Sequence, residues 1–121
     1  MEYRQLSNSD LRVPIIGLGS DTFGRDIDEK TTAGIIDHAL SLGINYIDTA
    51  DVYGWGGWAE RYTGLAVKGK RSRFIIATKF GVRVSEDLPQ GTFSLRHDLN
   101  SLFDVYPHNV LMIKINKWFT L

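Results

Sequence analysis

The sequence contains no cysteine and no long uninterrupted apolar segment. Without cysteine there are no disulfides, no thiolate metal ligands and no cysteine nucleophile, and such a composition is typical of a reducing compartment. A membrane-spanning helix needs roughly 20 consecutive apolar residues, so we predict no membrane span. The opening stretch, MEYRQLSNSD, also lacks the apolar run of a signal peptide. We therefore expect a cytoplasmic protein.

The chain also lacks an excess of either charge, because its 14 Lys and Arg residues balance 14 Asp and Glu residues. Such a balance exerts no general electrostatic pull on nucleic acid or on anionic membranes, and we expect neither as a partner. Hydrophobic residues make up 43% of the 121 residues and charged residues 23%, as in an ordinary globular protein. This length is enough for one core, so we treat residues 1–121 as one domain.

Short apolar runs rich in β-branched residues predict strands at residues 14–19, 44–48, 73–80 and 109–115. Their starts recur at intervals of about thirty residues, which is the size of a βα unit. Strands that are apolar on both faces, each followed by a helix, indicate a parallel sheet with right-handed crossovers. Ahead of them, YRQLSNSDLRV predicts a hairpin around the turn-prone SNSD.

Helical patterns occupy the intervals between these strands. Glu29 follows Asp26 by three residues, which resembles a capping box at the start of a helix. Gly43 suits the position just past the end of that helix. The apolar spacing between these two signals, with Ile36 and Leu40 on one face, predicts an amphipathic helix between the first two strands.

Two further helices are predicted downstream. The first covers residues 60–68 and is stopped by Gly69. The second starts at about Ser94, has leucines at helical spacing and ends before Pro107. Residues 81–92 show no periodicity and are interpreted as a loop.

Polar residues follow the predicted strands at their carboxyl ends. Asp48 ends the second strand, Tyr53 follows five residues later, and Lys79 lies near the end of the third. The loops that follow parallel strands converge at this edge of the sheet, so chemistry collects there. A phenol with a pKa of about 10 is a poor acid at neutral pH. A neighbouring ammonium favours the phenolate and a carboxylate holds the ammonium, which together predict a proton donor for a carbonyl oxygen.

Each of the three residues also has an ordinary structural interpretation. Asp48 could cap the following turn, and Tyr53 could be a half-buried loop aromatic. Lys79 could extend from the strand end into solvent. The occurrence of all three at one edge of the sheet favours a functional site.

The segment INYIDTADVYG, residues 44–54, resembles the signature of the aldo-keto reductase family. YRQLSNSDLRVPIIGLGSDTFG resembles the opening hairpin and first strand of that family, and RFIIATKFG resembles its lysine strand. The resemblance implies an α/β fold, a partial (β/α)8 TIM barrel with an N-terminal β-hairpin plus about three and a half βα units. A complete barrel takes about 250 residues, so residues 1–121 would form its N-terminal half. We expect such a truncated chain, alone, to bind cofactor weakly and to be weakly active or inactive.

The family transfers a hydride from NADPH to an aldehyde or ketone, and the resemblance assigns residues to this chemistry. It implies Tyr53 as the proton donor, Lys79 as the amine that promotes its ionisation, and Asp48 as the carboxylate paired with the lysine. Gly19 and Ser20, together with Asp48, would lie near the nicotinamide. The implied partner is a small-molecule carbonyl substrate, and no metal is implied. The glycines of GLGSDTFG do not have the G-x-G-x-x-G spacing and form no Rossmann fingerprint.

The sequence departs from the family pattern in several places. After Tyr53, GWGGWAERYTG needs about one extra residue to match the family, and Trp55 and Trp58 could be walls of a substrate pocket or part of a rearranged, partly exposed loop. An ungapped alignment puts Asn116 where the family has a catalytic histidine, and asparagine can donate a hydrogen bond to a carbonyl but cannot titrate. Activity is therefore expected to fall. Asp21 stands where the family usually has an aromatic residue, which puts a charge near the expected nicotinamide. We expect the three histidines, His38, His97 and His108, on the surface.

Three other functions stay open. The chain could be a non-catalytic half-barrel interaction module that self-associates through the open edges of its first and fourth strands. It could be a decayed fragment without activity. It could also be a Schiff-base aldolase that uses Lys79, although Asp48 should keep that lysine charged and a poor nucleophile.

Overall fold

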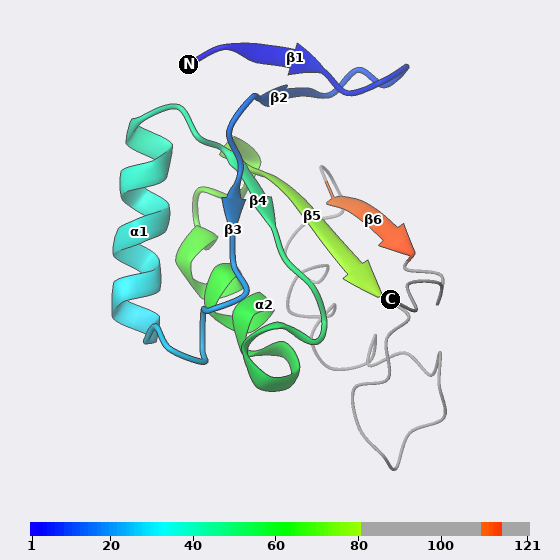
Figure 1. Cartoon of the computed structure of the whole chain (residues 1–121). Coiled ribbons are helices and arrows are strands. Elements are labelled where there is room, and N and C mark those ends of the chain that lie inside the picture. The colour runs from blue at the N-terminus through cyan, green and yellow to red at the C-terminus, as the bar shows by residue number, and fades with distance from the viewer. Residues whose placement is uncertain (81–109, 115–121) are drawn as a thin grey trace.

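The computed structural model describes residues 1–80 and 110–114 (Figure 1). In chain order the elements are β1 (Tyr3–Gln5), β2 (Arg12–Pro14), β3 (Leu18–Gly19), α1 (Glu29–Ser41), β4 (Tyr46–Asp48), α2 (Tyr53–Val67), the short 3-10 helix η1 (Arg71–Arg73), β5 (Ile75–Phe80) and β6 (Val110–Lys114). The loop predicted at residues 81–92 and the helix predicted from Ser94 lie outside the described residues. Of the helices described, none combines the length and apolarity that crossing a membrane would need.

The N-terminal hairpin is confirmed. β1 and β2 pair antiparallel, with Tyr3 opposite Pro14. The phenol of Tyr3 donates a hydrogen bond of 2.7 Å to the carbonyl oxygen of Gly43, which fastens the hairpin to the segment between α1 and β4. Figure 1 shows the hairpin at the end of the sheet where the strands begin. The hairpin therefore does not cover the opposite end, where the described strands finish.

The remaining strands form one parallel sheet in the order β3-β4-β5-β6, as predicted. The first strand is shorter than the prediction of residues 14–19, because Pro14 belongs to the hairpin and Ile15 and Ile16 are about half exposed. Among the described residues, β3 pairs with β4 on one side and with no strand on its other side. Within that part of the chain, β3 is therefore an edge strand. Self-association through such an edge stays a prediction.

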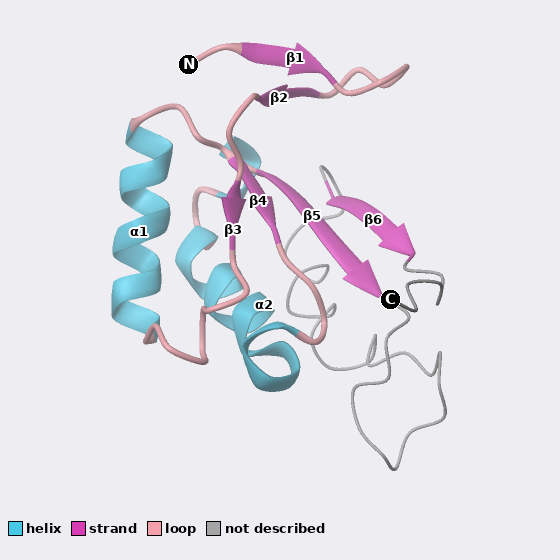
Figure 2. Cartoon of the chain, in the orientation of Figure 1, coloured by secondary structure: helices cyan, strands magenta, loops and turns pink. Residues whose placement is uncertain are grey.

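Both helices cover one face of the sheet (Figure 2). Ile47 of β4 and Ile76 of β5 are register partners with no exposed surface, and they pack in one cluster with Ile36 of α1 and Val67 of α2. Full burial stabilises each of these side chains by roughly 1.5–3 kcal/mol relative to exposure. Side chains alternate between the two faces along a strand. Tyr46 and Asp48 of β4, and Lys79 of β5, therefore point to the face opposite the helices.

Helix α1 starts two residues later than the capping box at Asp26 predicted, so that prediction was wrong. The N-cap is Asp28, whose carboxylate accepts a hydrogen bond of 2.7 Å from the backbone N–H of Thr31. Asp26 instead accepts a hydrogen bond from Arg25 at 2.8 Å. The helix ends as predicted, since Gly43 lies just past it with φ +82°, a conformation that glycine adopts at little cost.

Helix α2 was predicted at residues 60–68 and instead begins at Tyr53. Its start is not regular, because Gly54, Trp55, Gly56 and Gly57 all have positive φ, with values of 65°, 62°, 86° and 104°. We call residues 54–57 the left-handed turn. For a residue with a side chain this conformation costs about 1–2 kcal/mol, and in this turn only Trp55 bears that cost.

Candidate active site

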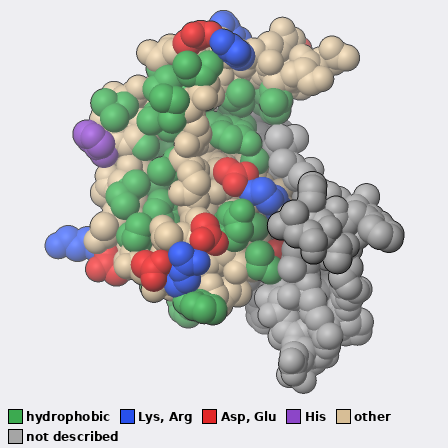
Figure 3. All heavy atoms as spheres, viewed as in Figure 1, with side chains coloured by type: hydrophobic (Ala, Val, Ile, Leu, Met, Phe, Trp, Pro, Cys, Tyr) green, Lys and Arg blue, Asp and Glu red, His purple; other side chains and the backbone are tan. Residues whose placement is uncertain are grey.

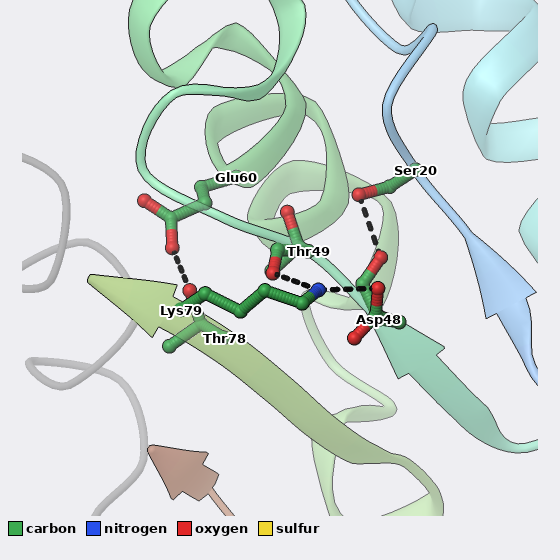
Figure 4. A network of polar contacts seen from close by, with 6 residues as sticks. All are labelled: Ser20, Asp48, Thr49, Glu60, Thr78 and Lys79. Atoms are coloured by element: carbon green, nitrogen blue, oxygen red, sulfur yellow. Dashed lines mark hydrogen bonds and ion pairs between the residues drawn. The ribbon is translucent and has the colours of Figure 1, made fainter. Parts of the chain in front are cut away.

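Lys79 and Asp48 form an ion pair at the carboxyl ends of neighbouring parallel strands. Asp48 is the last residue of β4 and Lys79 the next-to-last of β5. The ammonium of Lys79 donates hydrogen bonds to Oδ2 of Asp48 and, at 3.2 Å, to the carbonyl oxygen of Thr49 (Figure 4). The two side chains are 20% and 34% exposed, so the pair is partly shielded from solvent.

The surroundings keep the lysine protonated. Burial acts to lower the pKa of Lys79, but hydrogen bonding to Asp48 and the charges of Asp48 and Tyr53 outweigh it and raise this pKa above its ordinary value. At neutral pH the amine is therefore an ammonium. An ammonium has no lone pair with which to attack a carbonyl, which counts against the Schiff-base alternative.

Tyr53 approaches the same ammonium. It is the first residue of α2, and its ring centroid lies 5.0 Å from Nζ of Lys79, within the range of a cation–π contact. Its backbone N–H donates to the carbonyl oxygen of Ala50 at 3.1 Å, which closes the turn after β4. This turn brings the phenol back over the strand ends. The three residues singled out in the sequence thus meet at one place.

A second phenol, Tyr46, lies near the ion pair and was not predicted. It precedes Asp48 by two residues on β4 and so shares its face of the sheet. Burial and the charge of Asp48 raise the pKa of Tyr46, while Lys79 acts in the opposite direction. Tyr46 therefore holds its proton more firmly than an exposed tyrosine. The two-residue spacing from Asp48 was the available sequence signal.

Ser20 supports the end of β4. It is fully buried, and its backbone N–H and its hydroxyl both donate to the carbonyl oxygen of Asp48, at 3.1 and 3.0 Å (Figure 4). These contacts make Ser20 a positioning residue in the described structure, and its contact with a cofactor stays a prediction. The neighbouring Gly19 is exposed, and a Cβ built on it would meet no atom within 4 Å. Open space therefore adjoins Asp48 on the side of β3.

Asp51 is a second carboxylate close to the site that was not predicted. Its backbone N–H donates to the carbonyl oxygen of Lys79 at 3.3 Å, which continues the pairing of the two strands. Oδ1 of Asp51 is buried and has no hydrogen-bond partner among the described residues. Burial raises the pKa of Asp51, while the backbone N–H of Val52 acts in the opposite direction. This carboxyl group is therefore less acidic than an exposed one.

Behind the ion pair, α2 is tied to β5 through buried side chains. The hydroxyl of Thr78 donates to Oε1 of Glu60, and both residues are only 2% exposed (Figure 4). A buried carboxylate is expensive unless it is hydrogen-bonded, so this contact fixes the position of α2 relative to the strand. Thr78 directly precedes Lys79, and the tie thus steadies the strand end that carries the ammonium.

The remaining predicted residues are placed as follows. The carboxylate of Asp21 accepts a hydrogen bond of 3.0 Å from Arg25, so its charge is compensated. Figure 3 shows the same arrangement elsewhere on this face, where acidic and basic side chains lie next to each other. His38 is exposed, as predicted. His97, His108 and Asn116 lie outside the described residues.

Comparison with known proteins places this arrangement in a family. The model of the aldo/keto reductase family matches residues 15–110. An uncharacterized oxidoreductase, YrpG of Bacillus subtilis (strain 168), is 42% identical over 92 residues, which cover 71% of this chain and 28% of YrpG. Aldo-keto reductase YhdN of the same organism is 41% identical over 85 residues, covering 65% of this chain and 25% of YhdN.

Solved structures agree. The aldo-keto reductase AKR11C1 from Bacillus halodurans (holo form) matches with a TM-score of 0.64 and 43% identity, covering 74% of this chain and 29% of that chain. A putative aldo-keto reductase from Pseudomona aeruginosa matches with a TM-score of 0.59 and 38% identity, covering 65% and 31%. The chain thus spans less than a third of each of these relatives, and the described part corresponds to a portion of a (β/α)8 barrel. From the family match over most of its length, we conclude that this chain belongs to the aldo/keto reductase family.

Proposed function

We propose that this chain contributes the proton-donating side of an NADPH-dependent reduction of aldehydes or ketones to alcohols. The observation that carries the proposal is the ammonium of Lys79, which is bonded to Asp48 and lies 5.0 Å from the ring centroid of Tyr53. The chain spans under a third of the length of its relatives. That this chain has the reductase activity of a whole enzyme is therefore itself proposed.

In the proposed reaction Tyr53 gives its phenolic proton to the carbonyl oxygen while a hydride joins the carbonyl carbon. The C=O π bond is replaced by one C–H and one O–H bond, which yields the alcohol. The chemistry that NADPH supplies when bound is this hydride, and NADP⁺ is left. The ammonium of Lys79 stabilises the phenolate that remains on Tyr53, and Asp48 holds the ammonium in place.

The residues at the end of β3 suit a flat ring beside this site. Gly19 carries no side chain, and the space next to it is open to at least 4 Å from a built Cβ. Asp48 is its register partner on β4. We propose that Gly19, Ser20 and Asp48 line the nicotinamide position. The hydroxyl of Ser20 donates its hydrogen bond to the carbonyl oxygen of Asp48, so Ser20 would act there by holding Asp48 in place. We propose further that Asn116 donates a hydrogen bond to the substrate carbonyl.

The test is a fluorescence titration of the chain with NADPH, followed by an assay of NADPH oxidation with a short aliphatic aldehyde. We expect saturable binding and a slow, aldehyde-dependent oxidation. Lys79→Met should lower this rate by about 100-fold or more, since it removes the charge that stabilises the phenolate. An oxidation rate that is unchanged in Lys79→Met would overturn the proposed role of the ammonium.

The aldolase alternative is tested separately by borohydride trapping. A Schiff base on Lys79 forms with loss of water, and borohydride reduces it to a stable secondary amine. The chain would then gain the mass of the carbonyl compound less one oxygen atom. We expect no adduct at Lys79 near neutral pH, because the raised pKa of Lys79 keeps the amine protonated. A stoichiometric adduct that is absent from Lys79→Met would favour the aldolase instead.

A further inference from the structure

The left-handed turn, residues 54–57, presents a tryptophan to solvent next to the proposed proton donor. Trp55 is 77% exposed, more than any other large hydrophobic residue in the described part of the chain. It follows Tyr53 by two residues, so the two Cα atoms are at most about 7 Å apart. An indole attached at that distance is long enough to reach a molecule whose carbonyl group is held at Tyr53.

The turn is anchored, so the exposure of Trp55 is imposed by its neighbours. Gly54 and Gly57 are buried, and the backbone N–H of Gly54 donates to the carbonyl oxygen of Asp21 at 3.3 Å. A Cβ on Gly54 would overlap the carbonyl oxygen of Phe23 and lie 2.6 Å from the backbone nitrogen of Ala59. Contacts with Asp21 and Phe23, which follow β3, thus fix the backbone of Gly54, and the next residue, Trp55, lies in solvent.

Trp55 also stands in a conformation that a bulky side chain avoids. Its φ of 62° and ψ of 53° are left-handed, and asparagine or glycine would adopt them more readily. A tryptophan that is both strained and exposed contributes little to folding, and strain of this kind concentrates at ligand sites.

The nearby Trp58 provides a contrast. Its ring contacts that of Tyr62 edge-on at 5.7 Å and lies under the guanidinium of Arg61 at 5.1 Å. Its Cβ also packs against the backbone of Gly24. No such ring or cation contact is made by Trp55 within the described ranges. Its indole face is therefore available to a ligand.

We propose that Trp55 is a specificity-determining residue that binds the substituent of an aromatic aldehyde or ketone. This inference rests on the proposed function, because it assumes that the carbonyl group binds at Tyr53. An indole attracts another aromatic ring through offset or edge-to-face contact at centroid distances of about 4.5–7 Å, which a small alkyl group cannot match. Ketones that carry a phenyl ring should therefore bind more tightly than aliphatic ketones of similar reactivity.

The test uses the indole N–H resonances of the three tryptophans in the ¹⁵N-labelled chain, assigned by single Trp→Phe variants. With NADP⁺ present and no turnover, the chain is titrated with acetophenone and, in parallel, with butanone. We expect acetophenone to shift the Trp55 resonance saturably, with an affinity at least fivefold higher than that of butanone. An unshifted Trp55, or equal affinities for the two ketones, would overturn the proposal.

Two variants separate a ligand contact from a folding effect. Trp55→Asn suits the left-handed conformation and should fold, yet it should lose the preference for acetophenone. Trp58→Phe should retain that preference, and equal losses in both variants would contradict a specific role of Trp55. The titration measures binding alone, because no hydride is transferred from NADP⁺. A Trp55 shift in a chain that has no reductase activity would therefore contradict the proposed function and leave the ligand contact of Trp55 standing. A catalytically active chain without the shift would overturn only the aromatic specificity.

Discussion

Nζ of Lys79 lies 5.0 Å from the centroid of the Tyr53 ring while it donates a hydrogen bond to Asp48. One cation is therefore shared between an aromatic ring at the start of a helix and a carboxylate at the end of a strand. The sharing ties the turn after β4 to β5, so the same contacts that would promote proton donation also support the fold.

The first prediction concerns the coupling between Asp48 and Lys79. Removing either partner leaves the other partly buried without its charge partner, whereas removing both does not. In a cycle of Asp48→Asn, Lys79→Met and the double variant, we expect a coupling of roughly 0.5–2 kcal/mol in the free energy of unfolding. This is below the effect of a fully buried pair, because the side chains are 20% and 34% exposed. Urea unfolding measures it, and strictly additive effects would contradict the ion pair.

The second prediction concerns the left-handed turn. Gly54→Ala should destabilise the chain by more than about 1 kcal/mol, because the residue has φ +65° and the new Cβ would overlap Phe23. Gly64→Ala is the matched control, since Gly64 lies in the regular part of α2 and a Cβ there meets nothing within 4 Å. It should stabilise the chain by about 0.5–1 kcal/mol. Thermal unfolding of both variants measures the two changes in stability. If both substitutions stabilised the chain, or both destabilised it, the left-handed conformation of Gly54 would be contradicted.

The third prediction concerns pH. Burial raises the pKa of Asp51, so the folded chain holds this proton to a higher pH than the unfolded chain. The resulting stabilisation is present below the ordinary aspartate pKa of about 3.9 and is lost as the pH rises through the raised value. Asp51→Asn should therefore be more stable than the parent at about pH 7, and this advantage should disappear at about pH 3. A variant that is less stable at neutral pH would show that the ionised carboxylate has a stabilising partner.

The fourth prediction concerns Ser20 as a positioning residue. Ser20→Ala removes one of the two hydrogen bonds that reach the carbonyl oxygen of Asp48 and should lower the free energy of unfolding by about 0.5–1.5 kcal/mol. Ser41→Ala, which removes an exposed hydroxyl bonded to His38 within α1, should have a smaller effect. If the Lys79–Asp48 coupling is measured again in Ser20→Ala, it should fall. An unchanged coupling would show that Ser20 does not position Asp48.

Much of this arrangement could be predicted because it depends on short-range patterns. Apolar runs around Ile47 and Ile76 predicted the strands, and their parallel pairing follows from the helices between them. Once the strands are parallel and adjacent, Asp48 and Lys79 must finish at the same edge. The site could therefore be anticipated from spacing and from family resemblance together.

What could not be predicted depends on contacts that are settled only in the folded structure, some of them local and others between segments far apart in the chain. Asp26 and Asp28 are both reasonable N-caps, and only the observed bond to Thr31 decides between them. The left-handed turn arises because Asp21 and Phe23 pack against Gly54, and a Trp within a glycine-rich segment gives no sign of this. Tyr46 was interpreted as an ordinary strand residue because its environment is made by Asp48 and Lys79 of the assembled sheet.

The most direct test of the central claim compares the two phenols near the ion pair. Aldehyde-dependent NADPH oxidation is measured for the parent chain, for Tyr53→Phe and for Tyr46→Phe, each checked for folding by circular dichroism. Loss of a positioned proton donor lowers such rates by roughly 10²–10⁴-fold, and we expect this loss in Tyr53→Phe alone. Tyr46→Phe should stay within about threefold of the parent, a change of under 1 kcal/mol in the barrier. A Tyr53→Phe chain that is as active as the parent would contradict the account.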